Sequence, residues 1–465
     1  MAAERNASFD LIVRNGRVVT SRETRRLDVG IRGGRIAALE PSLPAKAAQE
    51  IDAGGCLVFP GFIDAHTHMG IPIKTTWSAD DFNTGSRAAA FGGITTIIDF
   101  TVQAKGQSLQ QALKERIHRA GGKSFVDVHL HVNVTDQPER WLHQIPSLIQ
   151  QGFRSFKTFS TYKEAGMMVT WTQFRLILET VSRSGGVVML HAEDDEIVER
   201  NTHRHLSTGR REPIYHARSR PAEAEARAIE TAARISRETQ APLYIVHLSS
   251  RQGLEAALEA RSRGTPLYIE TCPQYLLLNE QCYRKTNGHY YITTPPLRRP
   301  EDQEALWQAL CNGDIDVVGT DHCPFTRQQK EQGNRQFHQT PNGLPGVETL
   351  FPLLYTYGVH QNRITLQQLV QVLGTHPARI FGLNHRKGDI QIGLDADLII
   401  WNPDRETILS SSHGHGRADW CPYEGMKIAG TLEYTILRGT ILVHKGRLLA
   451  DTPAGEIIPA APPGS

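Results

Sequence analysis

The sequence predicts a (β/α)8 barrel of the TIM type, together with a small β-sandwich domain built from both ends of the chain. Eight short apolar runs alternate with helix-like segments over roughly 320 residues in the middle of the chain, as eight β/α units require. Short strands with tight turns occupy both ends. A doubly wound open sheet is the alternative fold, but no GxGxxG or GxxxxGKS/T loop follows any of the runs.

The two ends of the chain share one pattern. Residues 9–58 alternate as short strands with turns at Asn15-Gly16 and Gly33-Gly34, and residues 396–401 and 434–443 return to this style. We therefore expect residues 1–58 and 386–450 to form the β-sandwich domain and residues 59–385 to form the catalytic barrel. Residues 451–465 are rich in Ala, Pro and Gly, and we expect a loose C-terminal tail there.

The apolar runs supply the eight predicted barrel strands. Helix-like segments such as 222–237 and 253–263 lie between them and have the length that a βαβ crossover needs. The runs are 58–68, 94–100, 126–134, 153–159, 187–193, 243–249, 267–275 and 315–324.

Potential metal ligands stand in these runs, mostly at the C-terminal ends. The first run ends in His66 and His68, and residues at i and i+2 of a strand point to one face, so both imidazoles can reach one ion. In a barrel the strand ends converge, so donors that are distant in sequence meet. Six donors are too many for one tetrahedral ion and suit two ions roughly 3.5–4 Å apart. The other four are Lys157, His191, His247 and Asp321.

Lys157 is the unusual member of this set. An ammonium beside a divalent cation is repelled, so this side chain must be neutral, turned away or chemically modified. Taken alone, a lysine at the end of a strand is more often part of an ordinary ion pair.

The His-x-His spacing recurs elsewhere, as expected in a chain with 20 histidines. We expect supporting or core roles for one pair, solvated side chains in another, and a loop without metal for the third. We also expect His322 to give hydrogen-bonding support, and neither Cys272 nor Cys323 to be a nucleophile. In the order of these expectations, the three pairs are His129/His131, His203/His205 and His413/His415.

Composition excludes several classes of protein. The formal charge of +2 comes from 51 basic and 49 acidic residues that are interspersed, so no nucleic-acid partner is indicated. The first residues lack the apolar core of a signal peptide, and no run is long enough to span a membrane. Six cysteines form no CxxC pair, which fits a reducing cytoplasm.

A set of motifs resembles the amidohydrolase superfamily, specifically the dihydropyrimidinase/hydantoinase branch of the cyclic amidohydrolases. The motifs occur in the family's order and cover about residues 9–445. They are Gly61-Phe62-Ile63-Asp64-Ala65-His66-Thr67-His68, Ser155-Phe156-Lys157-Thr158-Phe159, Leu190-His191-Ala192-Glu193, Val246-His247-Leu248-Ser249-Ser250, Glu270-Thr271-Cys272-Pro273-Gln274-Tyr275, Thr294-Pro295-Pro296-Leu297-Arg298, Gly319-Thr320-Asp321-His322-Cys323-Pro324-Phe325, Pro341-Asn342-Gly343-Leu344-Pro345-Gly346-Val347-Glu348 and His376-Pro377-Ala378.

The resemblance implies two zinc ions, with manganese as an alternative, bridged by a carboxylated Lys157 and a hydroxide. By family role, His66, His68 and Asp321 hold the more buried ion, and His191 and His247 hold the more exposed one. Asp321 carries the proton from the nucleophile to the leaving ring nitrogen. The remaining family roles are that Tyr162 stabilises the oxyanion and crowds the ring substituent, and that Thr294 and Asn342 read the –NH–CO–NH– unit of the ring.

The resemblance also implies a substrate class and leaves alternatives open. We expect hydrolysis of hydantoins or 5,6-dihydropyrimidines to N-carbamoyl amino acids, in a homotetramer or dimer. Thr294 replaces the usual serine, but the family contacts the ring mostly through main-chain groups here, so we expect recognition to survive with some change in pocket width. Residues 71–76 depart from the family loop, so the preferred ring substituent stays open. Gly70 stands where dihydroorotases have an arginine, which favours a small neutral cyclic amide. Allantoinase is the nearest alternative. A catalytically inactive scaffold is disfavoured because all six ligand positions are filled.

Overall fold

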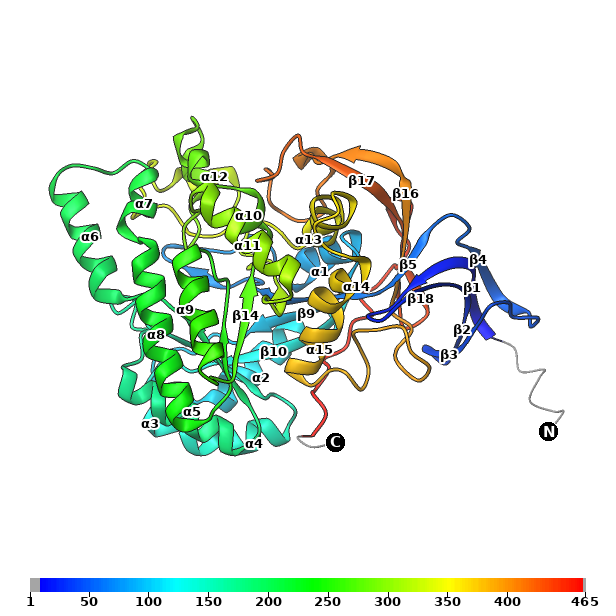
Figure 1. The fold of residues 1–465 in the computed structure, drawn as a ribbon, viewed down its shortest axis with the longest axis horizontal. Helices are drawn as coiled ribbons and strands as arrows, with labels where there is room; N and C mark the ends of the chain where they lie inside the picture. The colour runs from blue at the N-terminus through cyan, green and yellow to red at the C-terminus, as the bar shows by residue number, and fades with distance from the viewer. Residues whose placement is uncertain (1–8, 463–465) are drawn as a thin grey trace.

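The computed structural model describes residues 9–462 and contains the predicted barrel (Figure 1). Eight parallel strands follow one another around it, and the first and last meet through a parallel bridge between Thr67 and His322. Each strand lies within one of the eight apolar runs, so the fold prediction is confirmed. The barrel strands are β6 (Phe62–Thr67), β9 (Ile94–Phe100), β10 (Asp127–Asn133), β11 (Ser155–Phe159), β12 (Val187–His191), β13 (Leu243–Ile245), β14 (Leu267–Thr271) and β15 (Val317–Val318).

Helices cover the outside of the barrel (Figure 1). Several begin at a side chain that accepts hydrogen bonds from the first free N–H groups, such as Ser108 before α2 and Thr170 before α5. The α-helices are α1 (Phe82–Phe91), α2 (Leu109–Ala120), α3 (Pro138–Trp141), α4 (Ile145–Gln150), α5 (Trp171–Arg183), α6 (Asp195–Ser207), α7 (Ile214–Ser219), α8 (Ala222–Thr239), α9 (Arg251–Ser262), α10 (Pro273–Leu277), α11 (Pro300–Asn312), α12 (Arg327–Glu331), α13 (Leu350–Leu354), α14 (Leu366–Val370) and α15 (His376–Phe381).

Both chain ends pair into one nine-stranded sheet beside the barrel, as the β-rich ends predict. The C-terminal β16 runs antiparallel to the N-terminal β5, which joins the two segments. Gly61 links β5 to β6, and a Cβ there would lie 2.1 Å from Thr95 Oγ1, so only glycine fits this passage between the sheets. The strands are β1 (Phe9–Val19), β2 (Thr24–Arg32), β3 (Arg35–Glu40), β4 (Ala47–Asp52), β5 (Leu57–Pro60), β16 (Leu398–Ile408), β17 (Lys427–Leu437), β18 (Thr440–His444) and β19 (Arg447–Leu448); a separate short hairpin holds β7 (Pro72–Ile73) and β8 (Thr76–Trp77).

Residues 451–462 differ from the expected loose tail, and residues 463–465 of that tail lie outside the described part of the chain. The described segment runs beside the barrel (Figure 1), where Val128 N donates to Glu456 O and Ile458 N donates to Val128 O, both at 2.8 Å. Ile458 is fully buried, and its carbonyl lies 2.7 Å from His129 Nδ1. The prediction was wrong because it weighed overall composition, whereas one buried isoleucine and a few backbone hydrogen bonds hold the segment. Among the helices of residues 9–462, none combines the length and apolarity needed to cross a membrane.

Candidate metal centre

The six predicted ligands lie at one end of the barrel, where the C-terminal ends of the strands converge. His66 and Lys157 lie within β6 and β11, and His191 is the last residue of β12. The other three follow their strands at short distances. They are His68 after β6, His247 after β13 and Asp321 after β15.

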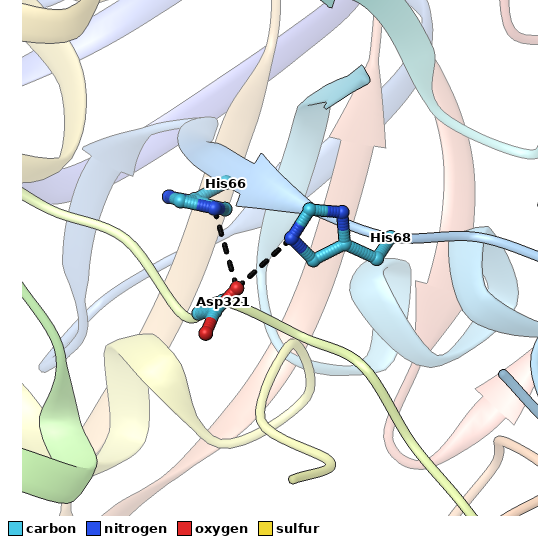
Figure 2. Close-up of side chains that lie close together, drawn as sticks. All are labelled: His66, His68 and Asp321. Atoms are coloured by element: carbon cyan, nitrogen blue, oxygen red, sulfur yellow. Dashed lines mark hydrogen bonds and ion pairs between the residues drawn. The ribbon is translucent and has the colours of Figure 1, made fainter. Parts of the chain in front are cut away.

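His66, His68 and Asp321 form a compact cluster (Figure 2). Asp321 Oδ1 lies 3.2 Å from His66 Nε2 and 3.0 Å from His68 Nε2. One candidate ligand atom from each of the three residues lies within 4.8 Å of the other two. The second Asp321 oxygen points away from both histidines in Figure 2. The arrangement therefore leaves one carboxylate oxygen free for a further task.

His191 and His247 form a second pair next to this cluster. His191 Nδ1 lies 2.9 Å from His247 Nε2, and the His247 ring centroid lies 5.4 Å from that of His66. Two imidazole nitrogens at that separation need a shared proton or a cation between their lone pairs. Burial lowers the pKa of both side chains, which favours neutral imidazoles.

Lys157 lies buried among these residues, and its charge interacts with those of His66, His191 and His247. Its Nζ lies 5.2 Å from the ring centroid of Phe100 and 4.8 Å from that of Phe159. Burial lowers the pKa of Lys157 to about 8, although Asp321 and Glu270 oppose the shift. The site therefore favours an uncharged amine far more than an exposed lysine would.

Two buried carboxylates orient the histidines, and the sequence analysis assigned no role to either. Glu270 lies 2.7 Å from His66 Nδ1 and accepts a hydrogen bond from His247 N at 2.9 Å. Glu193 lies 2.7 Å from His191 Nε2 and pairs with Arg220 at 2.5 Å. When a carboxylate accepts a hydrogen bond from one imidazole nitrogen, the other nitrogen keeps a lone pair that can bind a metal ion. Both glutamates belong to the family motifs, and an acidic residue at a strand end was the sequence feature that could have indicated their role.

Backbone strain is concentrated at this end of the barrel. Tyr162, His247 and Asp321 have φ values of 68°, 39° and 53°, in the left-handed region that residues with a side chain seldom adopt. Such conformations persist where the surrounding structure imposes them, typically at functional sites. At His247 and Asp321 this turn takes the chain out of the strand and brings the side chain to the cluster.

The three predicted substrate residues lie together beside the His191–His247 pair. The Tyr162 ring centroid is 5.1 Å from that of His191. Asn342 Nδ2 donates to Thr294 Oγ1 at 2.8 Å, and the Thr294 side chain also interacts with Tyr162. Burial raises the pKa of Tyr162, and the nearby Arg220 charge opposes this shift only in part. The phenol is therefore a hydrogen-bond donor throughout the neutral range.

The buried donor atoms fit a metal centre. Within residues 9–462, the buried His66 Nε2 makes no hydrogen bond, because Glu270 occupies only Nδ1 and the lone pair of Nε2 faces the carboxylate oxygen of Asp321 at 3.2 Å. Burial also lowers the pKa of His66, which leaves the Nε2 lone pair available. Neutral imidazoles and a carboxylate are the donor set that zinc and manganese accept.

The other histidine predictions have mixed outcomes. His131 lies between Ser155 Oγ at 2.6 Å and Ala65 O at 3.0 Å, and His322 accepts from Gly346 N and pairs with Asp80, so the expected supporting roles are confirmed. The prediction for His205 was wrong, because this residue packs against Tyr215 and is buried. His203 is exposed as expected, and His129 is buried in the core. In the third pair, His415 pairs with Glu348 and His413 is exposed. Cys272 and Cys323 are buried, and burial raises the pKa of both thiols.

A barrel that gathers histidines, an aspartate and a buried lysine at the C-terminal ends of its strands defines a class of metal-dependent (β/α)8 enzymes. The sequence pattern of the Amidohydrolase family matches residues 57–442. The chain belongs to this family, in its hydantoinase branch, and it is a hydrolase.

Individual relatives are similar over nearly their whole length. A D-hydantoinase of Geobacillus stearothermophilus is 38% identical over 98% of this chain and 97% of its own. A D-phenylhydantoinase of Escherichia coli O1:K1 / APEC is 36% identical over 97% and 99%. The crystal structure of a dihydropyrimidinase from Brevibacillus agri NCHU1002 superposes with a TM-score of 0.95, at 37% identity and coverage of 97% and 98%. An L-hydantoinase (dihydropyrimidinase) from Arthrobacter aurescens gives 0.89 at 31% identity, with 97% and 99% covered.

Proposed function

We propose that this protein opens the ring amide of hydantoins and 5,6-dihydropyrimidines to give N-carbamoyl amino acids. The observation that carries the proposal is the cluster of His66, His68 and Asp321 beside the His191–His247 pair. It occurs in a chain that aligns end to end with D-hydantoinases. The substrate is a small neutral cyclic amide, and the family's homotetramer or dimer is part of the same proposal.

The proposed ligands divide into two groups around Lys157. His66, His68 and Asp321 would hold one divalent cation, and His191 and His247 the other, with zinc preferred over manganese. The neutral amine of Lys157 would add to the carbon of carbon dioxide and release one proton, and the resulting carbamate would supply negatively charged oxygen ligands to the cations. When bound, the two cations would lower the pKa of a water molecule and polarise the ring carbonyl.

The chain's own residues then provide binding and proton transfer. Asp321 uses Oδ1 toward the histidines, and its second oxygen takes the proton of the attacking water and delivers it to the leaving ring nitrogen. Tyr162 donates its phenolic hydrogen to the oxyanion that forms at the attacked carbonyl. Thr294 and Asn342 hold the –NH–CO–NH– unit, which sets the distance between the ring carbonyl and the nucleophile.

A panel of five rings tests the proposal with zinc-loaded protein: hydantoin, 5-phenylhydantoin, dihydrouracil, allantoin and dihydroorotate. We expect turnover of the first three and little of dihydroorotate, because Gly70 offers no cation to its carboxylate. Higher kcat/KM on allantoin than on 5-phenylhydantoin and dihydrouracil would instead assign an allantoinase. The absence of stoichiometric zinc or manganese, together with no turnover, would support an inactive scaffold.

A further inference from the structure

A completely buried lysine lies behind the two segments that carry Thr294 and Asn342. Lys330, on α12, has no solvent exposure. Its Nζ donates to Ile292 O at 2.9 Å and to Pro341 O at 2.8 Å. These carbonyls belong to the two different segments, only one or two residues before Thr294 and Asn342, the residues that we assign to the substrate. One amine thus connects both parts of the binding surface.

The backbone around this amine forms a continuous set of hydrogen bonds. Gly343 N donates to the same Ile292 carbonyl at 3.0 Å, so Ile292 O is shared between Lys330 and the Asn342-containing segment. Gly343 has a φ of 144°, and a Cβ there would lie 2.3 Å from Cys323 O, so the segment has little freedom to move. The Thr294–Asn342 hydrogen bond is therefore framed by the contacts of Lys330.

The chemistry of Lys330 indicates a positioning role. Within residues 9–462 it forms no ion pair with a carboxylate, and burial lowers the pKa of its amine well below the usual value. A neutral amine still has two N–H groups, enough for both carbonyls. A buried amine costs stability relative to an apolar side chain of the same length unless its hydrogen bonds are needed. Only a long side chain that ends in a hydrogen-bond donor could reach both carbonyls at once.

A second lysine holds the same segment from the outer side. Lys74, in the loop between β7 and β8, donates from Nζ to His338 O at 2.9 Å and to Thr340 O at 2.6 Å. Lysine amines therefore hold the carbonyls of residues 338, 340 and 341. Lys74 extends from an exposed loop, whereas Lys330 is fully buried and holds Pro341 O, in the residue directly before Asn342.

We propose that Lys330 is a positioning residue that sets the spacing between segments 292–294 and 341–343 and thereby presents Thr294 and Asn342 to the ring. This inference rests on the proposed function, because it concerns how the same site reads its substrate. Removing the amine would deprive the buried Pro341 carbonyl of its lysine partner, leave Ile292 O with Gly343 N as its remaining donor, and let the segments separate. The loss would fall on substrate binding, since the side-chain hydrogen bonds of Lys330 within the described chain go to Ile292 and Pro341 and not to the candidate metal ligands.

A double-mutant cycle tests this role with zinc-loaded, full-length protein and hydantoin as substrate. We expect Lys330→Met to raise KM about tenfold, with a smaller change in kcat and unchanged zinc content, which is the loss expected for one or two net hydrogen bonds. In an Asn342→Ala background the same substitution should change kcat/KM by less than about threefold, because its effect passes through Asn342.

Lys387 offers a matched control. It is also a buried lysine, but it bonds Asp127 and Asp397, both at 2.6 Å, where the barrel meets the nine-stranded sheet. Lys387→Met should lower the unfolding midpoint and leave KM unchanged. If Lys330→Met yields no folded protein, Lys330→Gln replaces it in the same cycle, since its shorter amide can reach at most one carbonyl.

Two results would overturn the inference while leaving the proposed function intact. One is a wild-type KM in a folded Lys330 variant, and the other is an equal loss of kcat/KM with Asn342 and with alanine at that position. Failure of the proposed function looks different, because the zinc-loaded wild type would then turn over no ring amide at all, and the inference would fall with it.

Discussion

Replacing Glu270 by glutamine removes one charge from behind the candidate metal cluster while keeping the shape of the side chain. Its carboxylate lies 2.7 Å from His66 Nδ1, and it accepts from His247 N at 2.9 Å and from the Tyr244 hydroxyl at 2.8 Å. The glutamine carbonyl oxygen can still accept from His66 and His247. Its amide group then faces Tyr244, whose hydroxyl must turn and become the acceptor.

The size of the effect follows from these contacts. A hydrogen bond to a charged group contributes roughly 1 kcal/mol more than a neutral one, so two weakened bonds to the histidines amount to about 2 kcal/mol. This corresponds to a roughly 30-fold loss of metal affinity above about pH 8, where Glu270 is ionised, and to a smaller loss at pH 7; both lie near the range found when a carboxylate behind a metal-binding histidine is removed. Burial raises the pKa of Glu270 to about 8, so the metal-free protein holds a neutral acid at pH 7, and the glutamine variant, which has no such proton to lose, should be at least as stable as the wild type at that pH.

The sign of this linkage gives a second readout. Because the folded pKa lies above the unfolded value, Glu270 stabilises the metal-free protein fully below about pH 4.5, and this contribution is lost as the pH rises through about 8. Between pH 6 and 9 the free energy of unfolding of the metal-free Glu270→Gln variant should therefore fall less steeply than that of the wild type.

Zinc affinity is measured by competition with chelators of graded strength, alongside urea unfolding of the metal-free proteins. The control is Asp127→Asn, which changes another buried carboxylate, one that pairs with Lys387 at 2.6 Å at the opposite end of the barrel. That control should lose stability and keep its zinc affinity. If the Glu270→Gln variant bound zinc within about twofold of the wild-type affinity, the reasoning would be refuted, because the predicted 30-fold loss rests on the charge of this group.

Three further predictions address single features of the site and the fold. Lys157→Ala should abolish turnover and lower zinc content, and added bicarbonate or a short carboxylic acid should restore part of the activity; full activity of the variant would contradict the bridging role. Tyr162→Phe should reduce kcat about 100-fold with little change in KM, as for loss of one oxyanion donor, and an unchanged kcat would exclude that role. Deleting residues 452–465 should cost roughly 3–5 kcal/mol of unfolding free energy, from loss of the buried Ile458 side chain and of the His129 partner, as measured by urea denaturation; a wild-type midpoint would mean that the segment contributes nothing to stability.

The barrel could be predicted because strands buried on both faces appear in sequence as nearly continuous apolar runs. β9, for example, has the predicted bounds and is buried throughout. The predicted runs were too long where the chain becomes functional. The run 243–249 contains a strand of only three residues, since His247 leaves the extended conformation. Local pattern does not reveal such turns, because the strain is imposed by neighbouring elements.

The partners of the ligands were harder to predict than the ligands themselves. His66 and His191 can be found from their place at strand ends, but their carboxylate partners depend on register between strands. Glu270 reaches His66 from a strand that is 204 residues away in the chain. The sequence contained each of these residues but no measure of which carboxylate would face which imidazole.

The candidate metal ligands and the residues proposed to read the ring lie on different kinds of element. The histidines and their carboxylates belong to the barrel strands, whereas Thr294 and Asn342 lie in loops held together by Lys330. Changes to the two parts should therefore have different kinetic consequences. Replacing Glu270 should reduce zinc affinity and leave the KM of the fully loaded protein near its original value. Replacing Lys330 should raise KM and leave zinc affinity near its original value. Loops can thus change the accepted ring without disturbing the chemistry that a rigid set of strands provides.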